Sequence, residues 1–337
     1  MYFMKPLAIL LPVLVILLIL NISLGSILIP VGEIVRILIG QEPAEAAWKD
    51  IILDFRLTKA LTCILAGGGL AVSGLQMQTL FRNALAGPDV LGLSAGASLA
   101  VALIFLSQSI GLDIHFAPNP WIVVLAASAG ALGVFVIMVT VARKLTDNVS
   151  LLIIGLMIGA AASSLVSVMQ YTSNAEELQT YIMWTFGSLG KLGWPEIQIL
   201  AIVLLAGTAI ALRLSKALNA WLLGEYYAQN LGTNIRTTRR LAILSACILT
   251  GAVTAFCGPI AFVGLAVPHL VKLVVKTHNH RVLIPAVLLG GAILMLVCDS
   301  VTHLPGSAQT LPINAITALV GAPVVISIII RSRRLSQ

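Results

Sequence analysis

The chain has 337 residues, of which 59% are hydrophobic and 10% are charged, and its formal net charge is +7. A soluble domain carries about 25% charged residues, so this composition argues against a large soluble core and indicates a membrane protein. No polar linker divides the chain, which predicts a single transmembrane domain over residues 1–337.

Apolar runs predict the membrane-spanning helices in chain order. A helix needs about 20 residues to cross roughly 30 Å of hydrocarbon, and most of these runs reach that length. The run 241–271 contains Gly258-Pro259, which interrupts a helix, so we divide it into two spans. The sequence thus predicts an all-α polytopic membrane protein with about ten transmembrane helices. The expected spans are 6–28, 58–80, 90–108, 120–142, 149–170, 194–214, 240–257, 261–277, 282–300 and 312–331.

The first span has one alternative interpretation. Lys5 precedes its apolar residues, as in a signal peptide. The run exceeds 20 residues and no clear small-x-small cleavage site follows it, so we expect a retained helix.

Charge asymmetry predicts the orientation. With ten spans and both termini in the cytoplasm, 15 of the 20 lysines and arginines lie inside, whereas 10 of the 13 acidic residues lie outside. This distribution follows the positive-inside rule. The net positive charge therefore reflects the orientation of the chain in the membrane. We expect membrane lipid as a partner and no nucleic acid.

Several short motifs have structural interpretations that we prefer to chemical ones. Gly92-Leu93-Ser94-Ala95-Gly96 matches a hydrolase elbow, but it opens a predicted membrane helix instead of following a strand. Gly155 and Gly159 are spaced for helix packing, with lining of a pathway as the alternative. No group of histidines and cysteines has the spacing of a metal site, and the four cysteines are expected to be packing residues.

The source of energy is expected to lie outside the chain. The sequence has no G-x-x-x-x-G-K-[ST] motif, so we expect no enzyme activity and no ATP bound through a P-loop. Few ionisable residues fall in the middle of the spans, unlike the pattern of ion-coupled carriers.

A polar segment between spans six and seven predicts two short cytoplasmic helices at 216–236. Leu218, Trp221 and Leu222 form an apolar stripe that could lie along the membrane surface. Gly224 is expected to end the first helix, Glu225 to begin the second and Gly232 to close it. The alternatives are a solvated loop without a partner and a rigid element on which another protein pushes.

The chain resembles the permease family of binding-protein-dependent ABC importers for iron–siderophores, haem and cobalamin. The resemblance covers about residues 52–331. It rests on RLTKALTCILAGGGLAVSGLQMQTLFRNALAGPDVLGLSAGAS at 56–98, LNAWLLGEYYAQNLGTN at 218–234, GPIAFVGLAVPHLVK at 258–272, HRVLIPAVLLGG at 280–291 and LPINAITALVGAPV at 311–324.

The resemblance implies a homodimer in the bacterial inner membrane with two cytoplasmic ATPase subunits and an extracytoplasmic substrate-binding protein. ATP and magnesium would bind to the ATPase, and this chain would hold no cofactor. The cargo would be a large metal chelate, ferric siderophore before haem or cobalamin. An ion-coupled secondary transporter without an ATPase is the alternative.

The resemblance also implies functional residues. The ATPase-coupling residues would be Leu223, Gly224, Glu225, Ala228, Leu231 and Gly232. Arg56, Lys59 and His303 would face the binding protein, with helix-end anchoring as the alternative for the first two; the family commonly has a basic residue where His303 stands. Spans five and ten would line the pathway, and the candidates for pathway and gate are Asn148, Val149, Ser150, Ser163, Ser164, Ser167, Met169 and Gln170.

Overall fold

Helices form every regular element of the residues that the structure describes. A computed structural model describes residues 5–25, 29–107, 120–144, 148–303 and 310–334, and one isolated bridge joins His303 and Thr310. In chain order the elements are α1 (Lys5–Ser23), α2 (Val31–Leu38), α3 (Ala46–Asp50), the π-helix η1 (Ile51–Arg56), α4 (Leu57–Leu80), the 3₁₀ helix η2 (Pro88–Leu91), α5 (Leu93–Phe105), α6 (Pro120–Lys144), α7 (Asn148–Thr172), α8 (Ala175–Thr185), α9 (Trp194–Arg213), α10 (Ser215–Trp221), α11 (Glu225–Asn230), α12 (Ile235–Cys257), α13 (Val263–Val275), α14 (His280–Thr302) and α15 (Ile313–Arg334).

Each of the ten predicted spans contains an apolar helix. Six helices of the described part are long and apolar enough to cross a membrane, so the chain is a multi-pass membrane protein. These six are Ala46–Leu80, Pro120–Ala142, Val149–Thr172, Trp194–Arg213, Ile235–Cys257 and His280–Thr302. The other four predicted spans coincide with shorter apolar helices, which are Leu7–Ser23, Leu93–Phe105, Val263–Val275 and Ile313–Ser327.

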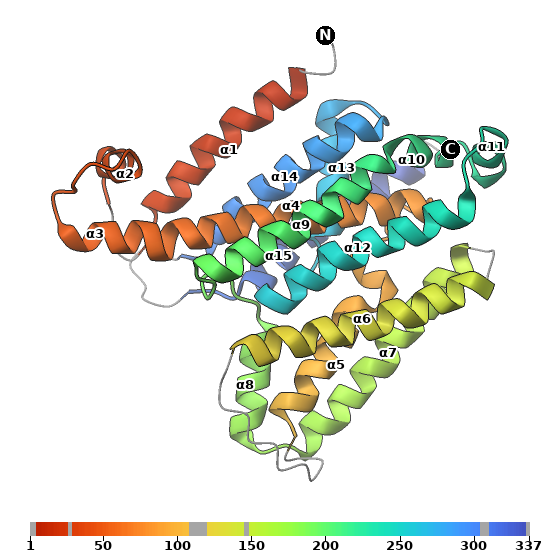
Figure 1. The fold of residues 1–337 in the computed structure, drawn as a ribbon, viewed down its shortest axis with the longest axis horizontal. Helices are drawn as coiled ribbons and strands as arrows, with labels where there is room; N and C mark the ends of the chain where they lie inside the picture. The colour runs from red at the N-terminus through yellow and green to blue at the C-terminus, as the bar shows by residue number, and fades with distance from the viewer. Residues whose placement is uncertain (1–4, 26–28, 108–119, 145–147, 304–309, 335–337) are drawn as a thin grey trace.

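Helix α4 is the centre of the bundle. It packs against α9, α12, α13 and α14, and α1 lies along the outer side of α14 (Figure 1). Its apolar window is 83% buried, whereas that of α6 or α7 is 22% buried. The core therefore forms around α4, and the peripheral helices leave their outer faces to lipid or to another subunit.

Glycines set the closest helix crossings. A Cβ on Gly67 would overlap the backbone of Gly291, and a Cβ on Gly74 would overlap the backbone of Gly264. Small residues at such crossings let two backbones approach in a membrane, where dispersion forces hold helices together. The glycine-rich stretch of α4 thus fixes the positions of α13 and α14.

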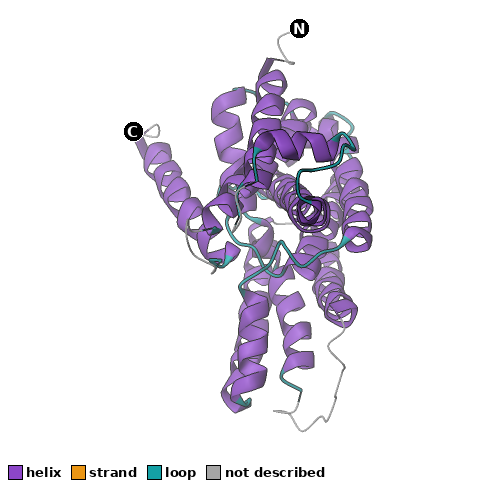
Figure 2. Cartoon of the chain, turned by 90° about the vertical axis from the view of Figure 1, so that its left-hand side faces the viewer, coloured by secondary structure: helices purple, strands orange, loops and turns teal. Residues whose placement is uncertain are grey.

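Helices α5 to α8 form a second group that extends below the first in Figures 1 and 2. Its core contains Ala97 and Val101 of α5, Val166 and Met169 of α7, and Tyr181 of α8. Gly155 lies against the backbone of Val90 and Leu91, so the packing interpretation of this glycine is confirmed. Gly92 begins α5 with φ of 74° and lies beside Gly155 and Gly159, which explains the GLSAG motif as a tight turn without a strand.

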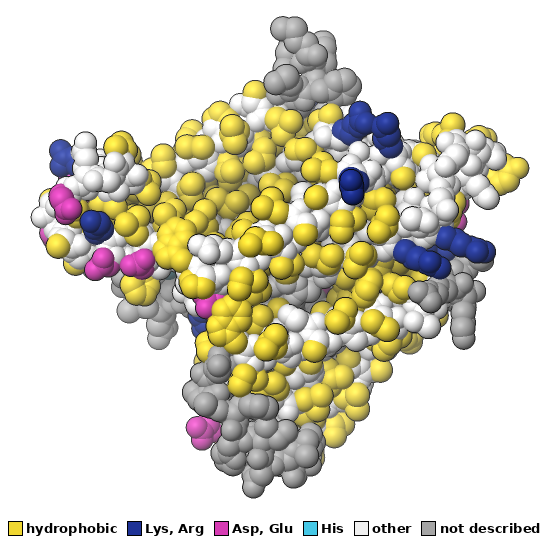
Figure 3. All heavy atoms as spheres, in the orientation of Figure 1, with side chains coloured by type: hydrophobic (Ala, Val, Ile, Leu, Met, Phe, Trp, Pro, Cys, Tyr) yellow, Lys and Arg dark blue, Asp and Glu magenta, His cyan; other side chains and the backbone are white. Residues whose placement is uncertain are grey.

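Charged side chains gather at two ends of the molecule. Figure 3 shows a broad hydrophobic band between one end, over α2 and α3, where acidic and basic groups mix, and the opposite end near α10 to α12, where basic groups dominate. This is the distribution that a bilayer imposes on a protein that crosses it.

Some predicted boundaries differ from the structure. Helix α12 begins at Ile235, five residues before the predicted start, because the side chain of Asn234 accepts a hydrogen bond from the backbone N–H of Thr237 at 3.0 Å. Arg236, Arg239 and Arg240 therefore lie on a helix. Helices α2, α3 and α8 were not predicted, since they are short and lie in polar segments outside the long apolar runs.

Candidate functional sites at the two ends of the bundle

Two short helices connect α9 to α12 at the basic end, and we call α10 and α11 together the platform. Helix α10 is fixed to the core by Trp221, whose ring is fully buried and whose Nε1 donates to the backbone oxygen of Leu80 at 3.2 Å. Leu218 is also fully buried. Leu218 and Trp221 of the predicted stripe thus pack on the protein and do not lie along the membrane surface, whereas Leu222 is 37% exposed.

A buried polar network also joins α10 to α14 and α4. The side-chain oxygen of Asn219 accepts from the backbone N–H of His280 at 2.8 Å, and its Nδ2 donates to Asn279. This oxygen lies 2.8 Å from Nδ1 of His280, so Nδ1 must carry the proton. Nε2 of His280 then accepts from the hydroxyl of Thr79, also at 2.8 Å. The network holds one face of the platform rigidly against the bundle.

The second helix of the platform is fixed to α12. Gly224 has φ of 110°, a backbone conformation that is strained in residues with a side chain. It turns the chain from α10 into α11. The carboxylate of Glu225 then accepts two hydrogen bonds from NH2 of Arg239, at 2.9 and 3.2 Å. The guanidinium of Arg239 lies 5.9 Å from the centre of the Trp221 ring. Arg239 therefore joins both helices of the platform to α12.

The outer face of the platform is apolar and exposed. Tyr226 is 76% exposed, Leu231 67%, Tyr227 64% and Leu223 61%. Of the predicted coupling residues, Leu223, Leu231 and Gly232 are exposed, Glu225 is partly buried, and Gly224 and Ala228 face inward. The two tyrosines were not among the predicted residues, although adjacent aromatic residues in a polar segment were a visible signal.

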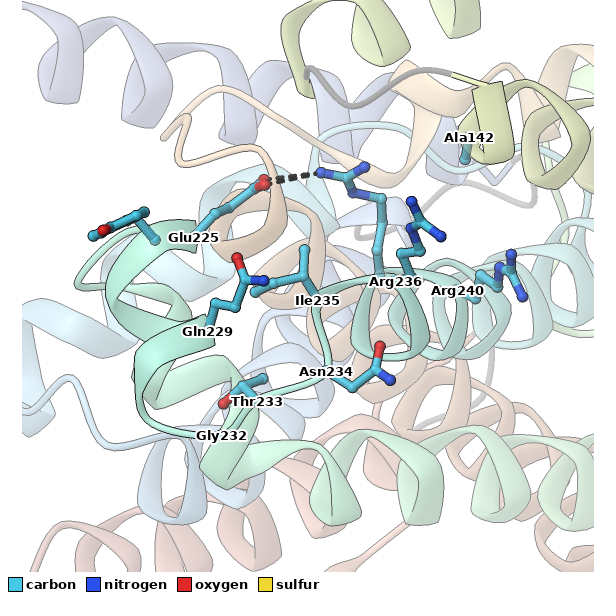
Figure 4. A pocket seen from close by; sticks show the side chains of 11 residues that line it. Ala142, Glu225, Gln229, Gly232, Thr233, Asn234, Ile235, Arg236 and Arg240 are labelled. Atoms are coloured by element: carbon cyan, nitrogen blue, oxygen red, sulfur yellow. Dashed lines mark hydrogen bonds and ion pairs between the residues drawn. The ribbon is translucent and has the colours of Figure 1, made fainter.

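A hollow of about 660 Å³ lies between α11, the first turns of α12 and the end of α6 (Figure 4). Glu225, Gln229 and Asn234 line it together with the three arginines of α12. Arg236 and Arg240 are exposed, and the only described ion pair of the hollow is that between Glu225 and Arg239. The charge pattern of the sequence indicates only topology for these arginines.

The opposite end of the bundle holds a buried ion pair. Nζ of Lys59 lies 2.8 Å from Oδ1 of Asp299, whose side chain is 3% exposed, and Asn21 donates to the other carboxylate oxygen at 3.0 Å. Nζ of Lys59 also lies 2.7 Å from Nε2 of His303. A lysine ammonium only donates, so His303 is neutral with its proton on Nδ1. Burial and then the charge of Lys59 lower the pKa of His303, and Asp299 partly opposes them.

Arg56 stands next to this cluster at the end of the π-helix η1. It donates to the backbone oxygens of Ile22 at 2.8 Å and Ser23 at 3.1 Å, which are the last carbonyls of α1. A cation stabilises such a helix end through the helix dipole. The structure therefore brings Arg56, Lys59 and His303 together around one hollow of about 280 Å³, and it gives Arg56 and Lys59 intramolecular partners as well.

The predicted pathway residues divide between two faces of α7. Ser163, Ser164 and Ser167 are exposed, and Ser164 and Ser167 each donate to a backbone carbonyl four residues earlier at 2.9 Å. Met169 instead packs into the core of the second helix group, because it continues the buried face of Val166. Val149 is exposed, and Ser150 and Gln170 are partly buried. Asn148 begins α7, and its side chain lies outside the described part.

No cluster of three metal-ligating side chains occurs among the residues that the structure describes. The four cysteines are all buried, as the packing interpretation predicts.

Comparisons with known proteins agree with this architecture. The FecCD transport family matches residues 13–331. The chain is 35% identical over 295 residues to the hemin transport system permease protein HmuU of Yersinia pestis, an alignment that covers 86% of this chain and 85% of that one. It is 34% identical over 283 residues to the vitamin B12 import system permease protein BtuC of Klebsiella pneumoniae, with 84% and 83% covered.

A solved structure assigned to the metal-chelate type of ABC transporter, in an inward-facing conformation, has the same fold. It superimposes with a TM-score of 0.84 at 28% identity, over 97% of this chain and 99% of that one. Both the sequence pattern and the fold therefore extend over nearly the whole chain. The chain belongs to the FecCD transport family.

Proposed function

We propose that the chain is the transmembrane permease subunit of an ATP-driven importer that moves a large metal chelate across the bacterial inner membrane. A permease for hemin and a permease for vitamin B12 are similar to it over most of its length, which supports a cargo of this class. Ferric siderophore, haem and cobalamin are the candidates, and the chain itself is not an enzyme.

The observation that carries the proposal is the platform. Its inner side is fixed to α4, α12 and α14 by hydrogen bonds and an ion pair, and its outer side presents Leu223, Tyr226, Tyr227 and Leu231 to solvent. Exposed aromatic and aliphatic residues on a rigid element are typical of a protein interface. We infer that two ATPase subunits, which bind ATP and magnesium, dock here in a homodimer of the chain.

All ten apolar helices are proposed to cross the membrane, with both termini in the cytoplasm. The platform then lies in the cytoplasm, and the cluster around Lys59 and Asp299 lies outside. The excess of cations at the platform end supports this orientation.

The pathway is proposed to run along α7 and α15 at the two-fold axis, with the first residues of α7, Asn148, Val149 and Ser150, as its gate. The exposed hydroxyls of Ser163, Ser164 and Ser167 support this placement, because a face that met only lipid would gain nothing from them. Their hydroxyls could contact a polar cargo without holding it tightly.

A soluble or lipid-anchored binding protein is proposed to dock at the outer cluster. Arg56, Lys59 and His303 line one hollow there. Because Asp299 neutralises Lys59 and His303 is neutral, Arg56 supplies most of the positive charge for an acidic partner.

An ion-coupled secondary transporter is the competing function. It would leave the exposed apolar face of the platform without a partner. The similarity to permeases of ABC importers supports the importer.

Co-purification tests the proposal. Leu223→Asp with Leu231→Asp should reduce retention of a P-loop ATPase at least about tenfold, since two exposed apolar contacts are each expected to contribute about 1 kcal/mol or more. Ile39→Asp is the matched control, because Ile39 is 70% exposed at the opposite end. Equal ATPase retention in the double variant and the control would exclude the platform as the docking site.

A further inference from the structure

Two hollows follow one another along the seam between α6 and α12. The first is the arginine-lined hollow beside the platform, which Ala142 of α6 closes on one side. The second has a volume of about 410 Å³ and is almost wholly apolar, with Leu132 and Phe135 of α6, Val203 of α9, and Leu244 and Ile248 of α12 in its wall. One seam therefore changes from basic at its end to apolar within the membrane.

The change occurs along a single ridge of α12. This ridge consists of residues spaced four apart, which lie one turn apart along the surface of the helix: Arg236, Arg240, Leu244 and Ile248. At 1.5 Å per residue, Arg240 and Ile248 are about 12 Å apart along the axis, close to the depth of one leaflet in a hydrocarbon core of roughly 30 Å.

The two arginines are electrostatically suited to an anion. They stand in the first two turns of α12, where the positive end of the helix dipole disfavours cations. Neither has an acidic partner within 4 Å in the described part of the chain, and Glu225 is already paired with Arg239. An anion between Arg236 and Arg240 would interact favourably with both guanidinium groups and with the helix end.

The apolar hollow opens toward lipid. In Figure 1 helices α6, α9 and α12 lie on the near face, and Figure 3 shows that face to be largely hydrophobic around them. Figure 2 places the C-terminal helix α15, part of the proposed pathway, at the opposite side of the molecule. Leu125 and Leu132 of the hollow are 66% and 58% exposed, so its wall is accessible to acyl chains.

We propose that this seam binds an anionic phospholipid, with its phosphate between Arg236 and Arg240 and an acyl chain against Leu244, Ile248 and Leu132. Basic hollows at the cytoplasmic ends of transmembrane helices recognise lipid headgroups in this way. The site is distinct from the transport pathway and needs no assumption about the cargo. A bound lipid would hold α12, and through Arg239 the platform, in a defined position relative to α6.

Native mass spectrometry of the full complex tests the proposal. The purified complex is depleted of lipid and then incubated with vesicles of phosphatidylglycerol or of phosphatidylcholine. The number of lipids that each chain retains is then counted. Arg236→Gln with Arg240→Gln should weaken the binding of phosphatidylglycerol about 25-fold, because each cation near an anionic headgroup contributes about a factor of five. Arg213→Gln with Lys216→Gln removes the same charge from exposed positions outside the hollow and should leave retention unchanged.

A second pair of variants tests the acyl chain. Leu132→Trp fills the apolar hollow and should reduce retention of phosphatidylglycerol without changing any charge. Val136→Trp is its control, since Val136 is 54% exposed on the same helix but does not line the hollow. Normal retention in Leu132→Trp together with displacement by inorganic phosphate would replace the lipid with a simple anion. Loss of the ATPase from the arginine variant, with lipid retention unchanged, would identify the hollow as a contact for that subunit and would overturn the proposal.

Discussion

Arg239 connects both helices of the platform to α12. Its side chain is 6% exposed, and its guanidinium pairs with Glu225 and lies over the ring of Trp221. A buried cation without its counter-ion destabilises a fold, so Glu225 is needed for structure as well as for any contact with a partner. A charge reversal at Glu225 would therefore disturb the platform itself, and exposed apolar residues make better probes of docking.

Glu225→Gln should lower the thermal stability of the purified protein. Because the Glu225 carboxylate is one-third exposed, water screens part of the interaction, and we expect a loss of about 1–2 kcal/mol. Thermal unfolding in detergent measures it. Glu45→Gln makes the same chemical change at an exposed carboxylate without a described ion pair, and an equal loss in that variant would show that the Arg239 bridge contributes nothing specific.

His303 predicts a pH dependence at the outer end. Burial and the charge of Lys59 lower the pKa of His303 below its usual value of about 6.5. As the pH falls, His303 is therefore protonated in the unfolded chain before it is protonated in the folded protein. The stability that neutral His303 contributes above pH about 6.5 is lost as the pH falls through the lowered pKa of the folded protein.

His303→Gln should remove this part of the pH dependence, because an amide oxygen can still accept from Lys59 but does not titrate in this range. Thermal unfolding at several values between pH 7.5 and about 5 compares the two proteins. If stability falls with pH to the same extent in the wild type and the variant, folding does not change the pKa of His303.

At the scale of the helix, α4 depends on residues without side chains. Gly74→Ala should push α4 away from α13 and cost more than about 2 kcal/mol, because the new Cβ would meet the backbone of Gly264. Gly133→Ala is the matched control: nothing lies within 4 Å of its added Cβ, so it should be neutral or slightly stabilising through helix propensity. The yield of folded protein and its melting temperature distinguish them, and equal behaviour would contradict the close crossing.

The helices differ in how far their sequences predict them. Charge-free length was enough for the ten apolar helices, and Gly224 and Gly232 were enough for the ends of α11. The start of α12 was missed because Asn234, the capping residue, stands among polar residues that resemble a loop. Helix α8 has a similar cap, in which Asn174 accepts from the backbone N–H of Glu177, and that pattern could have revealed it.

The direction in which a side chain faces was harder to predict. Ala228 and Met169 were expected at functional surfaces, yet the structure buries both. Met169 stands on α7, which is apolar on several sides, and Ala228 stands on a helix of only six residues, so periodicity does not identify the inner face of either helix. The pairing of Lys59 with Asp299 was also not predictable, because 240 residues separate them and only the fold brings them together.

For the whole molecule, the main feature is the separation of the two candidate functional sites by a hydrophobic band. The platform and the arginines of α12 occupy one end, and the cluster of Arg56, Lys59 and His303 occupies the other. A signal between them must pass through the helices, and α12 and α14 each connect directly to the platform.

Cysteine labelling tests which end faces the cytoplasm. The native cysteines are buried, so single cysteines introduced at exposed positions can report accessibility. In intact cells a membrane-impermeant maleimide should label Glu42→Cys and should not label Asn230→Cys until the membrane is opened. The reverse pattern would invert the proposed orientation and would place the platform where no cytoplasmic ATPase could reach it.

The measurement that tests the importer most directly is uptake by proteoliposomes that contain the chain and its co-purified subunits. Haem, cobalamin and a ferric siderophore are offered in turn with the cognate binding protein. We predict that at least one chelate is taken up only when ATP is supplied on the platform side, that collapsing ion gradients with ionophores has no effect, and that Leu223→Asp with Leu231→Asp abolishes uptake. Uptake by the chain alone, driven by an ion gradient and unchanged in that variant, would contradict the account.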